Sequence, residues 1–156
     1  MNFEIKFKDN ISLFLGANGS GKTTVFQVLR KLRKFIIGDG DARVLQVFPK
    51  TDLTRWETRL IQKFELDLEG NGGIYKYSLE IEHQEDEKPP KVLSEKLTFD
   101  NHPVSDFGIQ EQEEKLVAQA SIYKDDSNDT GSVLPVVDSS RSVISVVPER
   151  RDYQGI

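Results

Sequence analysis

The sequence predicts an α/β protein in which one strand–loop–helix unit precedes a mostly antiparallel β-sheet. Three observations lead to this fold class. The apolar run ISLFL at residues 11–15 passes directly into a glycine-rich turn, and apolar residues then recur with helical spacing. From about Glu57 onward, apolar and polar residues alternate with the period of two that is typical of strands. We therefore expect a single domain over residues 1–156, with the unit at 1–40 and a β-rich subdomain at 41–156.

The first forty residues contain the elements of this unit. Residues 3–8 alternate apolar and charged side chains, which predicts a half-buried strand, and the run at 11–15 predicts a strand covered on both faces. A helix is expected from about Gly21 to Ile37, and Gly38 is expected to end it. The apolar stripe of this helix consists of Val25, Val28, Leu29, Leu32, Phe35 and Ile36.

The β-rich part begins with a clear hairpin. Two alternating stretches flank the turn EGNGG at residues 69–73, which contains the Asn-Gly pair favoured in tight hairpin turns. Each stretch places its apolar residues on one face of its strand. These residues are Phe64, Leu66 and Leu68 in the first stretch, and Tyr75, Tyr77, Leu79 and Ile81 in the second.

Further strands and loops follow the hairpin. Residues 82–91 are charged, carry two prolines and predict a surface loop, and LSEKLTF at 93–99 predicts a strand. DNHPVSD at 100–106 predicts a turn, and the alternating apolar residues Leu116, Ala118, Ala120 and Ile122 predict another strand. Residues 124–132 predict a polar loop. The apolar residues Val143, Ile144, Val146 and Val147 predict either a short strand or the start of a helix.

Composition excludes several classes of protein. The chain has no cysteine, so disulfides and thiolate metal sites are excluded, and the isolated His83 and His102 have no metal-ligand spacing; we expect both to be ordinary loop or strand-end residues. The sequence contains no membrane span and no secretory signal, so we expect a cytoplasmic protein. Residues 1–36 carry seven Lys or Arg against two acids, whereas the whole chain has a net charge of −5. The basic first quarter suits phosphate binding, and the acidic remainder argues against strong non-specific binding of nucleic acid.

Residues 16–23, GANGSGKT, match the Walker A pattern G-x-x-x-x-G-K-[ST] of a phosphate-binding loop. Glycines let such a loop curl so that its backbone N–H groups point at phosphate oxygens, and the helix that follows directs its free N–H groups at the same place. The lysine reaches the β and γ phosphates, and the hydroxyl of Thr23 binds Mg²⁺. The predicted nucleotide-binding residues are Asn18, Gly19, Ser20, Gly21, Lys22, Thr23 and Thr24, with Thr23 as the metal ligand and ATP and Mg²⁺ as the cofactors.

The segment FLGANGSGKTTVFQVLRKL resembles the Walker A region of ABC-type ATPase heads, in particular the SMC, RecF-like and OLD-family predicted prokaryotic ATPases. The most specific part of the resemblance is Asn18 with the Gly19–Thr23 run, and SSRSVISVVPER at 139–150 resembles a segment found midway through such proteins. The resemblance implies a P-loop NTPase fold in which this chain is the N-terminal lobe of an ATPase head. It also implies that ATP is sandwiched with a second lobe, from a homodimer or a companion subunit.

The elements needed for hydrolysis are not evident in the sequence. The resemblance implies a Walker B strand ending in Asp-Glu, a signature loop and a switch histidine, all in a C-terminal lobe. The closest Walker B candidate is Asp138 in LPVVDSS, but Pro135 interrupts the run, so we expect an ordinary strand end or turn. Leu93-Ser94 lacks the glycines of a signature loop and is expected to be structural. A Mg²⁺-contacting glutamine is left open between Gln119 and Gln154, and the catalytic residues stay unknown.

Three functions are compatible with these observations. The leading interpretation is an ATP-binding N-terminal lobe that becomes an ATPase when a C-terminal lobe or partner completes it. A non-hydrolytic, nucleotide-dependent module that docks protein or DNA is the first alternative. Its cationic edge would consist of Arg30, Lys31, Arg33 and Lys34, together with Arg55, Arg59 and Lys63 around Trp56. A small P-loop kinase is the second alternative, although the β-rich remainder offers no helical lid.

Overall fold

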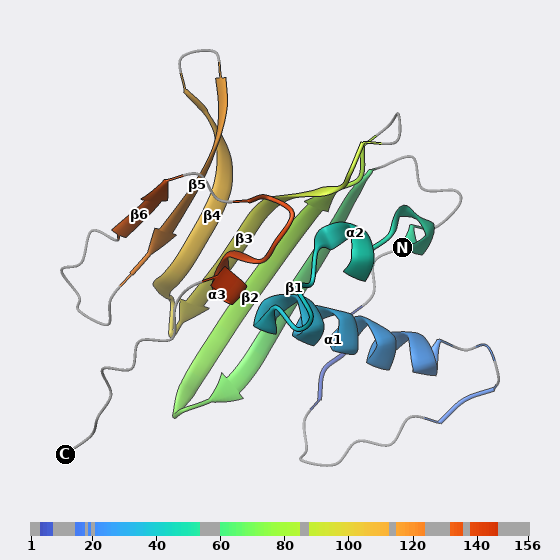
Figure 1. Cartoon of the computed structure of the whole chain (residues 1–156). Coiled ribbons are helices and arrows are strands. Elements are labelled where there is room, and N and C mark those ends of the chain that lie inside the picture. The colour runs from blue at the N-terminus through green and yellow to red at the C-terminus, as the bar shows by residue number, and fades with distance from the viewer. Residues whose placement is uncertain are drawn as a thin grey trace.

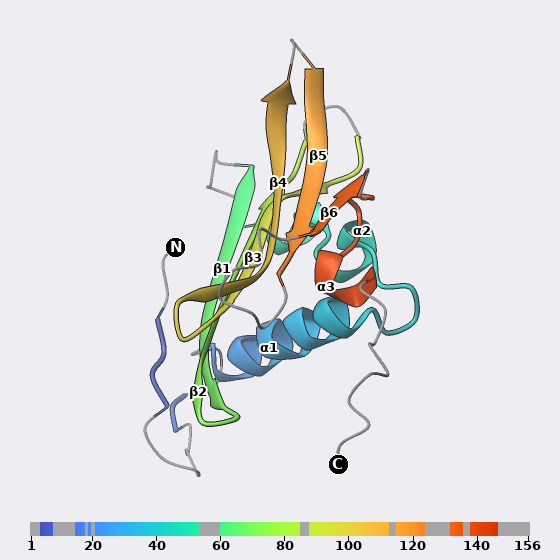
Figure 2. The same cartoon turned by 90° about the vertical axis from the view of Figure 1, so that its left-hand side faces the viewer.

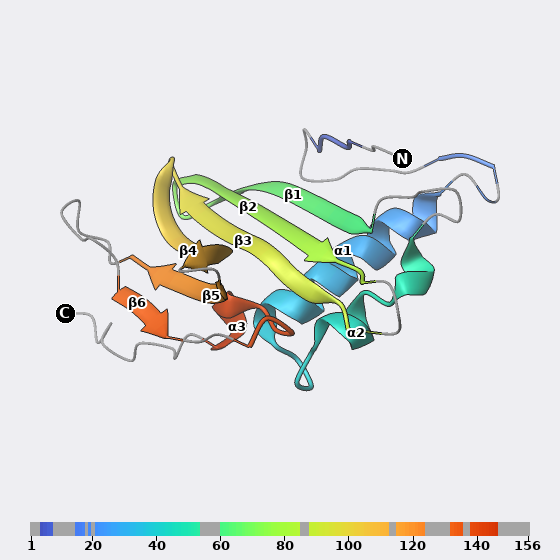
Figure 3. The same ribbon diagram turned by 90° about the horizontal axis from the view of Figure 1, so that it is seen from above.

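A single antiparallel sheet forms one layer of the protein, and the helices form a second layer on one of its faces (Figure 1). The computed structural model describes residues 4–7, 15–17, 19, 21–53, 60–84, 88–112, 115–123, 132–135 and 138–146. Seen from above, the longest helix crosses the sheet obliquely (Figure 3). The side view places all three labelled helices on the same side of the strands (Figure 2).

The elements follow one another simply along the chain. They are α1 (Lys22–Ile37), α2 (Val44–Val47), the 3₁₀ helix η1 (Lys50–Asp52), β1 (Ile61–Gly70), β2 (Gly73–Glu82), β3 (Lys91–Phe99), β4 (His102–Gln112), β5 (Lys115–Ile122), β6 (Ser132–Pro135) and α3 (Val143–Val146). The strand order in the sheet is the chain order, β1 to β6, and each strand is antiparallel to the next. Within the described ranges, no helix combines the length and the apolar character needed to cross a bilayer.

The β1–β2 hairpin confirms the two predicted strands, and its turn lies within the predicted EGNGG. Asn71 and Gly72 have φ of 52° and 80°, the positive values that a tight hairpin turn requires of its central residues. The predicted apolar faces meet across the ladder, since the paired residues are Phe64 with Leu79, Leu66 with Tyr77, and Leu68 with Tyr75. Leu79 and Ile81 are fully buried, so this face of the hairpin supplies much of the core.

One strand was missed by the sequence analysis. Residues 100–106 were expected to form a turn, but the turn consists of Asp100 and Asn101, with φ of 45° and 66°, and β4 begins at His102. Two adjacent residues with positive φ make a two-residue hairpin turn. The polar residues that follow this turn therefore pair with β3 and belong to a strand. The strand predicted around Ala118 and Ala120 is confirmed as β5.

Helix α1 confirms the predicted stripe and begins one residue later than expected, at Lys22. Leu32 and Phe35 are buried, and the Phe35 ring packs edge-on against Phe48 with ring centroids 5.5 Å apart. Gly38 ends the helix in the left-handed conformation, with φ of 67°. The short helix α2, which no sequence periodicity predicted, places Val44 and Val47 in the same core.

The expected strand at residues 3–8 is not formed where the structure describes it. Residues 4–7 carry no strand, and Phe7 is half exposed. A strand needs a neighbour to satisfy its backbone, and every described strand pairs with another member of the β1–β6 sheet. Leu15, which was expected to be covered on both faces, is 82% exposed, and residues 11–14 lie outside the described part.

Candidate functional site

The glycine-rich loop lies at the N-terminal end of α1. Gly19 and Gly21 have φ of 84° and 86°, values that a side chain would make unfavourable, and Gly21 is the residue that precedes the helix. The Nζ atom of Lys22 donates hydrogen bonds to the carbonyl oxygens of Gly16 and Ala17, at 2.6 and 2.7 Å. The cationic side chain therefore folds back along the loop. Asn18 and Ser20, two of the predicted binding residues, lie outside the described residues.

The electrostatic character of this helix end suits an anion. Gly21 supplies no side-chain cap, and no acidic residue lies in the first turn of α1. The first turn of α1 therefore directs its backbone N–H groups and the positive end of the helix dipole at the loop, without a competing carboxylate in that turn. Thr23 and Thr24 are both exposed in this turn, so their hydroxyls can approach a ligand bound in the loop.

The described residues contain no ready-made metal centre. No group of three or more His, Asp or Glu side chains there could hold an ion. Mg²⁺ commonly keeps several waters and binds through one or two protein ligands plus phosphate oxygens. The exposed hydroxyl of Thr23 fits a role of that limited kind.

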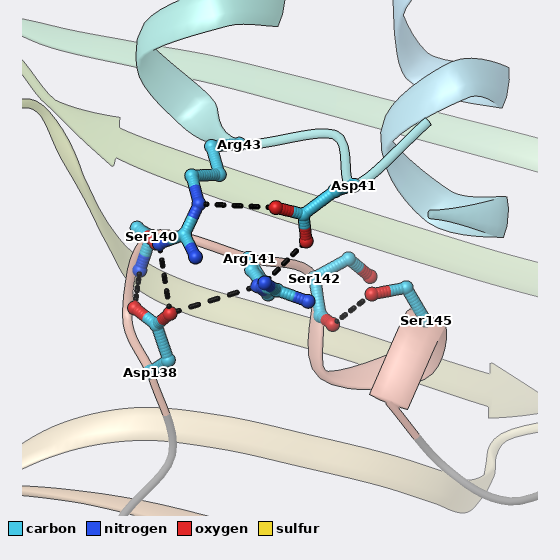
Figure 4. A network of polar contacts seen from close by, with 7 residues as sticks. All are labelled: Asp41, Arg43, Asp138, Ser140, Arg141, Ser142 and Ser145. Carbon is cyan, nitrogen blue, oxygen red and sulfur yellow. Dashed lines mark hydrogen bonds and ion pairs between the residues drawn. The ribbon is translucent and has the colours of Figure 1, made fainter. Parts of the chain in front are cut away.

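Asp138 does not lie near the loop. It follows β6 and belongs to a polar network beyond the opposite end of α1, where Arg43 Nη1 lies 3.2 Å and Arg141 Nε 3.6 Å from its Oδ2 atom (Figure 4). Its Oδ1 atom accepts a hydrogen bond from the backbone N–H of Ser140, at 2.9 Å. A helix of 16 residues, such as α1, is about 24 Å long. Asp138 is therefore a turn residue, as expected, and the structure does not bring it to the glycine-rich loop.

The charge state of Asp138 follows from these contacts. Hydrogen bonding from the side chain of Ser140 and from its backbone N–H, together with the charges of Arg43 and Arg141, lowers the pKa of the Asp138 carboxyl below its ordinary value. Arg141 also pairs with Asp41, and Arg43 Nε lies 3.5 Å from Asp41 Oδ2. The four charged groups form one partly exposed cluster.

A buried carboxylate is the feature that sequence analysis missed most clearly. Glu95 has no exposed surface, although its neighbours in β3, Ser94 and Lys96, are partly or fully exposed. Its Oε1 atom accepts hydrogen bonds from the hydroxyls of Tyr77 (2.8 Å) and Ser142 (2.6 Å), and its Oε2 atom accepts one from the backbone N–H of Val143 (2.6 Å). Burial raises the pKa of Glu95, and these three hydrogen bonds oppose the shift. The signal in the sequence was Glu95 occupying the register of apolar residues, opposite Leu79.

The remaining candidate residues are dispersed. Gln119 alternates with the buried Ala120 on β5, so it faces away from the helical layer, where it lines a hollow of about 400 Å³ with Ser94 and Gly108. Gln154 lies outside the described residues. His83 directly follows β2 and His102 begins β4, which confirms the expected loop or strand-end positions. His83 is also buried, and its Nε2 atom lies 3.0 Å from Gln62 Oε1. Desolvation lowers the pKa of His83, which favours the neutral ring.

Comparison with known proteins gives one result. No curated protein and no solved structure matches the chain. A family model described as an AAA domain, putative AbiEii toxin, type IV TA system, matches residues 11–133. The matched range includes the glycine-rich loop, α1 and the sheet as far as the start of β6. Because the match covers well over half of the sequence, the chain belongs to this family of P-loop NTPase-type AAA domains.

Proposed function

We propose that the chain is a MgATP-binding lobe of an ABC-type ATPase head and that it hydrolyses ATP only with elements from a second lobe or partner. The observation that carries the proposal is the contact of Lys22 with the carbonyls of Gly16 and Ala17 at the uncapped start of α1. This arrangement gathers a cation, backbone N–H groups and the helix dipole at one point. A polyphosphate would replace the carbonyls as the partner of the ammonium group, and its charge would be far better matched.

The proposed assignment of roles follows the loop. The backbone N–H groups of residues 18–21 and of the first turn of α1 would surround the β and γ phosphates, and Lys22 would neutralise them. The hydroxyl of Thr23 would contribute one ligand to Mg²⁺, whose other ligands would be phosphate oxygens and water. Thr24, the next exposed hydroxyl, would bind an adjacent phosphate.

Two observations support the need for a second lobe. Large apolar side chains flank the loop and are exposed, with Leu15 at 82% and Phe26 at 51%. Exposed apolar surface beside a ligand site is typical of a surface that another chain or domain covers. In addition, the acid considered for Mg²⁺ and water, Asp138, is held beyond the far end of α1 by Arg43 and Arg141. A copy of the chain or a companion subunit would supply the catalytic acid.

The alternatives receive less support from the structure. Lys31, part of the proposed DNA-binding edge, pairs with Asp52, and Lys63 pairs with Glu65 and Glu80. The hydrogen bonds that Lys63 donates to Glu65 and to Glu80 raise the pKa of Lys63. Arg55, Trp56 and Arg59 lie outside the described residues. A kinase lid is also unsupported, since the described helices other than α1 have three or four residues each.

Calorimetry with MgATP, together with steady-state phosphate release, tests the proposal. The wild-type chain is expected to bind MgATP without turnover, and Lys22→Ala is expected to lose binding at least tenfold, since a charge-assisted contact to phosphate contributes about 1.5–3 kcal/mol. Arg33→Ala is the matched control, because it removes an equal charge from an exposed position of the same helix. An equal loss of MgATP affinity in both variants would mean that the effect of Lys22→Ala comes from the change in net charge alone. Turnover by the wild-type chain alone, abolished in Lys22→Ala, would contradict the need for a second lobe.

A further inference from the structure

The segment Asp138–Val146, called the strap here, joins the helical layer to the sheet. Its backbone is tied to both layers: the N–H of Val44 in α2 donates to the carbonyl of Ser140, at 2.8 Å, and the N–H of Val92 in β3 donates to the carbonyl of Ser139, at 2.7 Å. Two consecutive carbonyls of the strap thus bind different layers. The strap crosses between α2 and the strands in Figure 4.

The side chains of the strap form an outer and an inner set of contacts. The outer set is the partly exposed charge cluster, in which Asp138 and Arg141 of the strap meet Arg43 and Asp41 of the segment between α1 and α2. The inner set is buried, and in it the Ser142 hydroxyl and the Val143 backbone N–H both donate hydrogen bonds to Glu95. Salt can screen the exposed charges of the outer set, whereas the inner set is buried away from water.

The strap also contacts the C-terminal end of α1. A Cβ atom added at Gly38 would lie 2.9 Å from the Cβ of Ser145, so the glycine that ends α1 and the short helix α3 are in close approach. Val143 is buried in the same core as Leu32 and Phe35 of α1. The half of α1 that is best buried is therefore the half that the strap covers, while the half that carries the phosphate loop is more exposed.

We propose that closure of the strap is coupled to order at the phosphate-loop end of α1, about 24 Å away along the helix. The coupling rests on the proposed nucleotide-binding function of that loop. Helix α1 can direct its N-terminal N–H groups at a phosphate only while it is folded and docked, and the strap stabilises the docked state. A ligand that binds the docked state must by linkage also stabilise the closed strap. MgATP binding and strap closure therefore reinforce each other.

Three backbone amides report on strap closure directly. They are Val143, bonded to Glu95, Val44, bonded to Ser140, and Val92, bonded to Ser139. Hydrogen exchange measured on the full chain is expected to slow at all three when MgATP is added. The Arg141→Ala variant, which opens the outer set of contacts, is expected to speed their exchange and to weaken MgATP binding about two- to fivefold, the range for an exposed ion-pair cluster.

Lys96→Ala is the matched control. Lys96 pairs with Asp106 at 3.3 Å and is also partly exposed, but neither residue belongs to the strap or contacts α1 in any described interaction. Two results together would overturn the proposal. The first is a folded Arg141→Ala variant that binds MgATP as tightly as Lys96→Ala does, and the second is hydrogen exchange at the three amides of the wild-type chain that MgATP does not slow.

A second readout separates this proposal from the proposed function. If the wild-type chain binds no MgATP, nucleotide binding fails, and the coupling is then tested at the amide of Val25, which donates to the carbonyl of Gly21 at the start of α1. Without nucleotide, faster exchange of Val25 in Arg141→Ala than in Lys96→Ala supports the coupling between strap and helix. Equal exchange in the two variants rejects it.

Discussion

Replacing Gly38 by alanine measures how tightly the strap closes against α1. Gly38 has φ of 67°, and an added Cβ would lie 2.9 Å from the Cβ of Ser145, closer than such atoms normally approach. The substitution therefore has two costs. The left-handed conformation costs about 1–2 kcal/mol for a residue with a side chain, and relief of the close contact adds about 1–3 kcal/mol, the range for overpacking.

Gly40→Ala provides the control for the first cost alone. Gly40 has φ of 65°, nearly the same as Gly38, but nothing lies within 4 Å of its added Cβ. We expect Gly40→Ala to lower the free energy of unfolding by about 1–2 kcal/mol and Gly38→Ala by about 2–5 kcal/mol. The difference between the two variants is the cost of moving the strap.

Urea denaturation followed by circular dichroism measures both variants, and each kcal/mol should also lower Tm by about 2–4 °C in a domain of this size. Adding Ser145→Gly to Gly38→Ala should recover the contact cost, with Ser145→Gly alone closing the double-mutant cycle. Equal destabilisation by Gly38→Ala and Gly40→Ala, with no recovery in the double variant, would refute the close packing of strap and helix.

Two further predictions concern carboxyl groups. Glu95→Ala should lower the free energy of unfolding by at least about 2 kcal/mol, because three buried donors lose their acceptor, whereas Glu95→Gln should cost less, since its amide can offer oxygen to the Val143 N–H and nitrogen to the hydroxyls. Because the pKa of Glu95 is raised in the folded state, its contribution to the free energy of unfolding is fully present below the unfolded pKa, about 4.3, and is lost as pH rises through the folded pKa. Chemical denaturation at a series of pH values should therefore show the stability of wild type increasing relative to that of Glu95→Gln as pH is lowered. Asp138 has the opposite sign, because its lowered pKa gives stability that is present above about pH 3.9 and lost as pH falls through the folded value. Asp138→Asn should thus be less stable than wild type at pH 7 and converge with it in acid, and a constant difference across this range would contradict the ion pairs.

The elements of the fold that the sequence predicted correctly are those specified by a pattern within a few consecutive residues. The β1–β2 hairpin follows from strict alternation on both sides of an Asn-Gly turn, and α1 follows from a stripe ended by Gly38. Strand β4 was missed because His102 and Pro103 at its start are typical of turns, although their pairing with Phe99 and Thr98 makes them strand residues. Tertiary pairing overrode local propensity there.

The candidate site shows the same division. The residues of the proposed phosphate loop stand out in the sequence because phosphate binding requires a fixed spacing of glycines, lysine and a hydroxyl in contiguous sequence. The Glu95 contacts and the charge cluster do not, because the contact partners of Glu95 lie 18, 47 and 48 residues away in the chain, and Asp41 and Arg141 of the cluster lie about 100 residues apart. A single sequence contains no local pattern that joins Arg43 to Ser140. Such long-range contacts form only when the strap packs against the segment that follows α1.

The chain-order arrangement of the sheet has a consequence for how the protein is assembled during synthesis. Each strand pairs with its neighbour in sequence, so every pairing within the sheet joins consecutive strands of the chain, and local contacts of this kind form quickly. Helix α1 emerges from the ribosome before any of these strands, but the strap that secures it is made after the last of them. Helix α1 is therefore the first element synthesised of those described, and its contacts with the strap are the last of its contacts that can form.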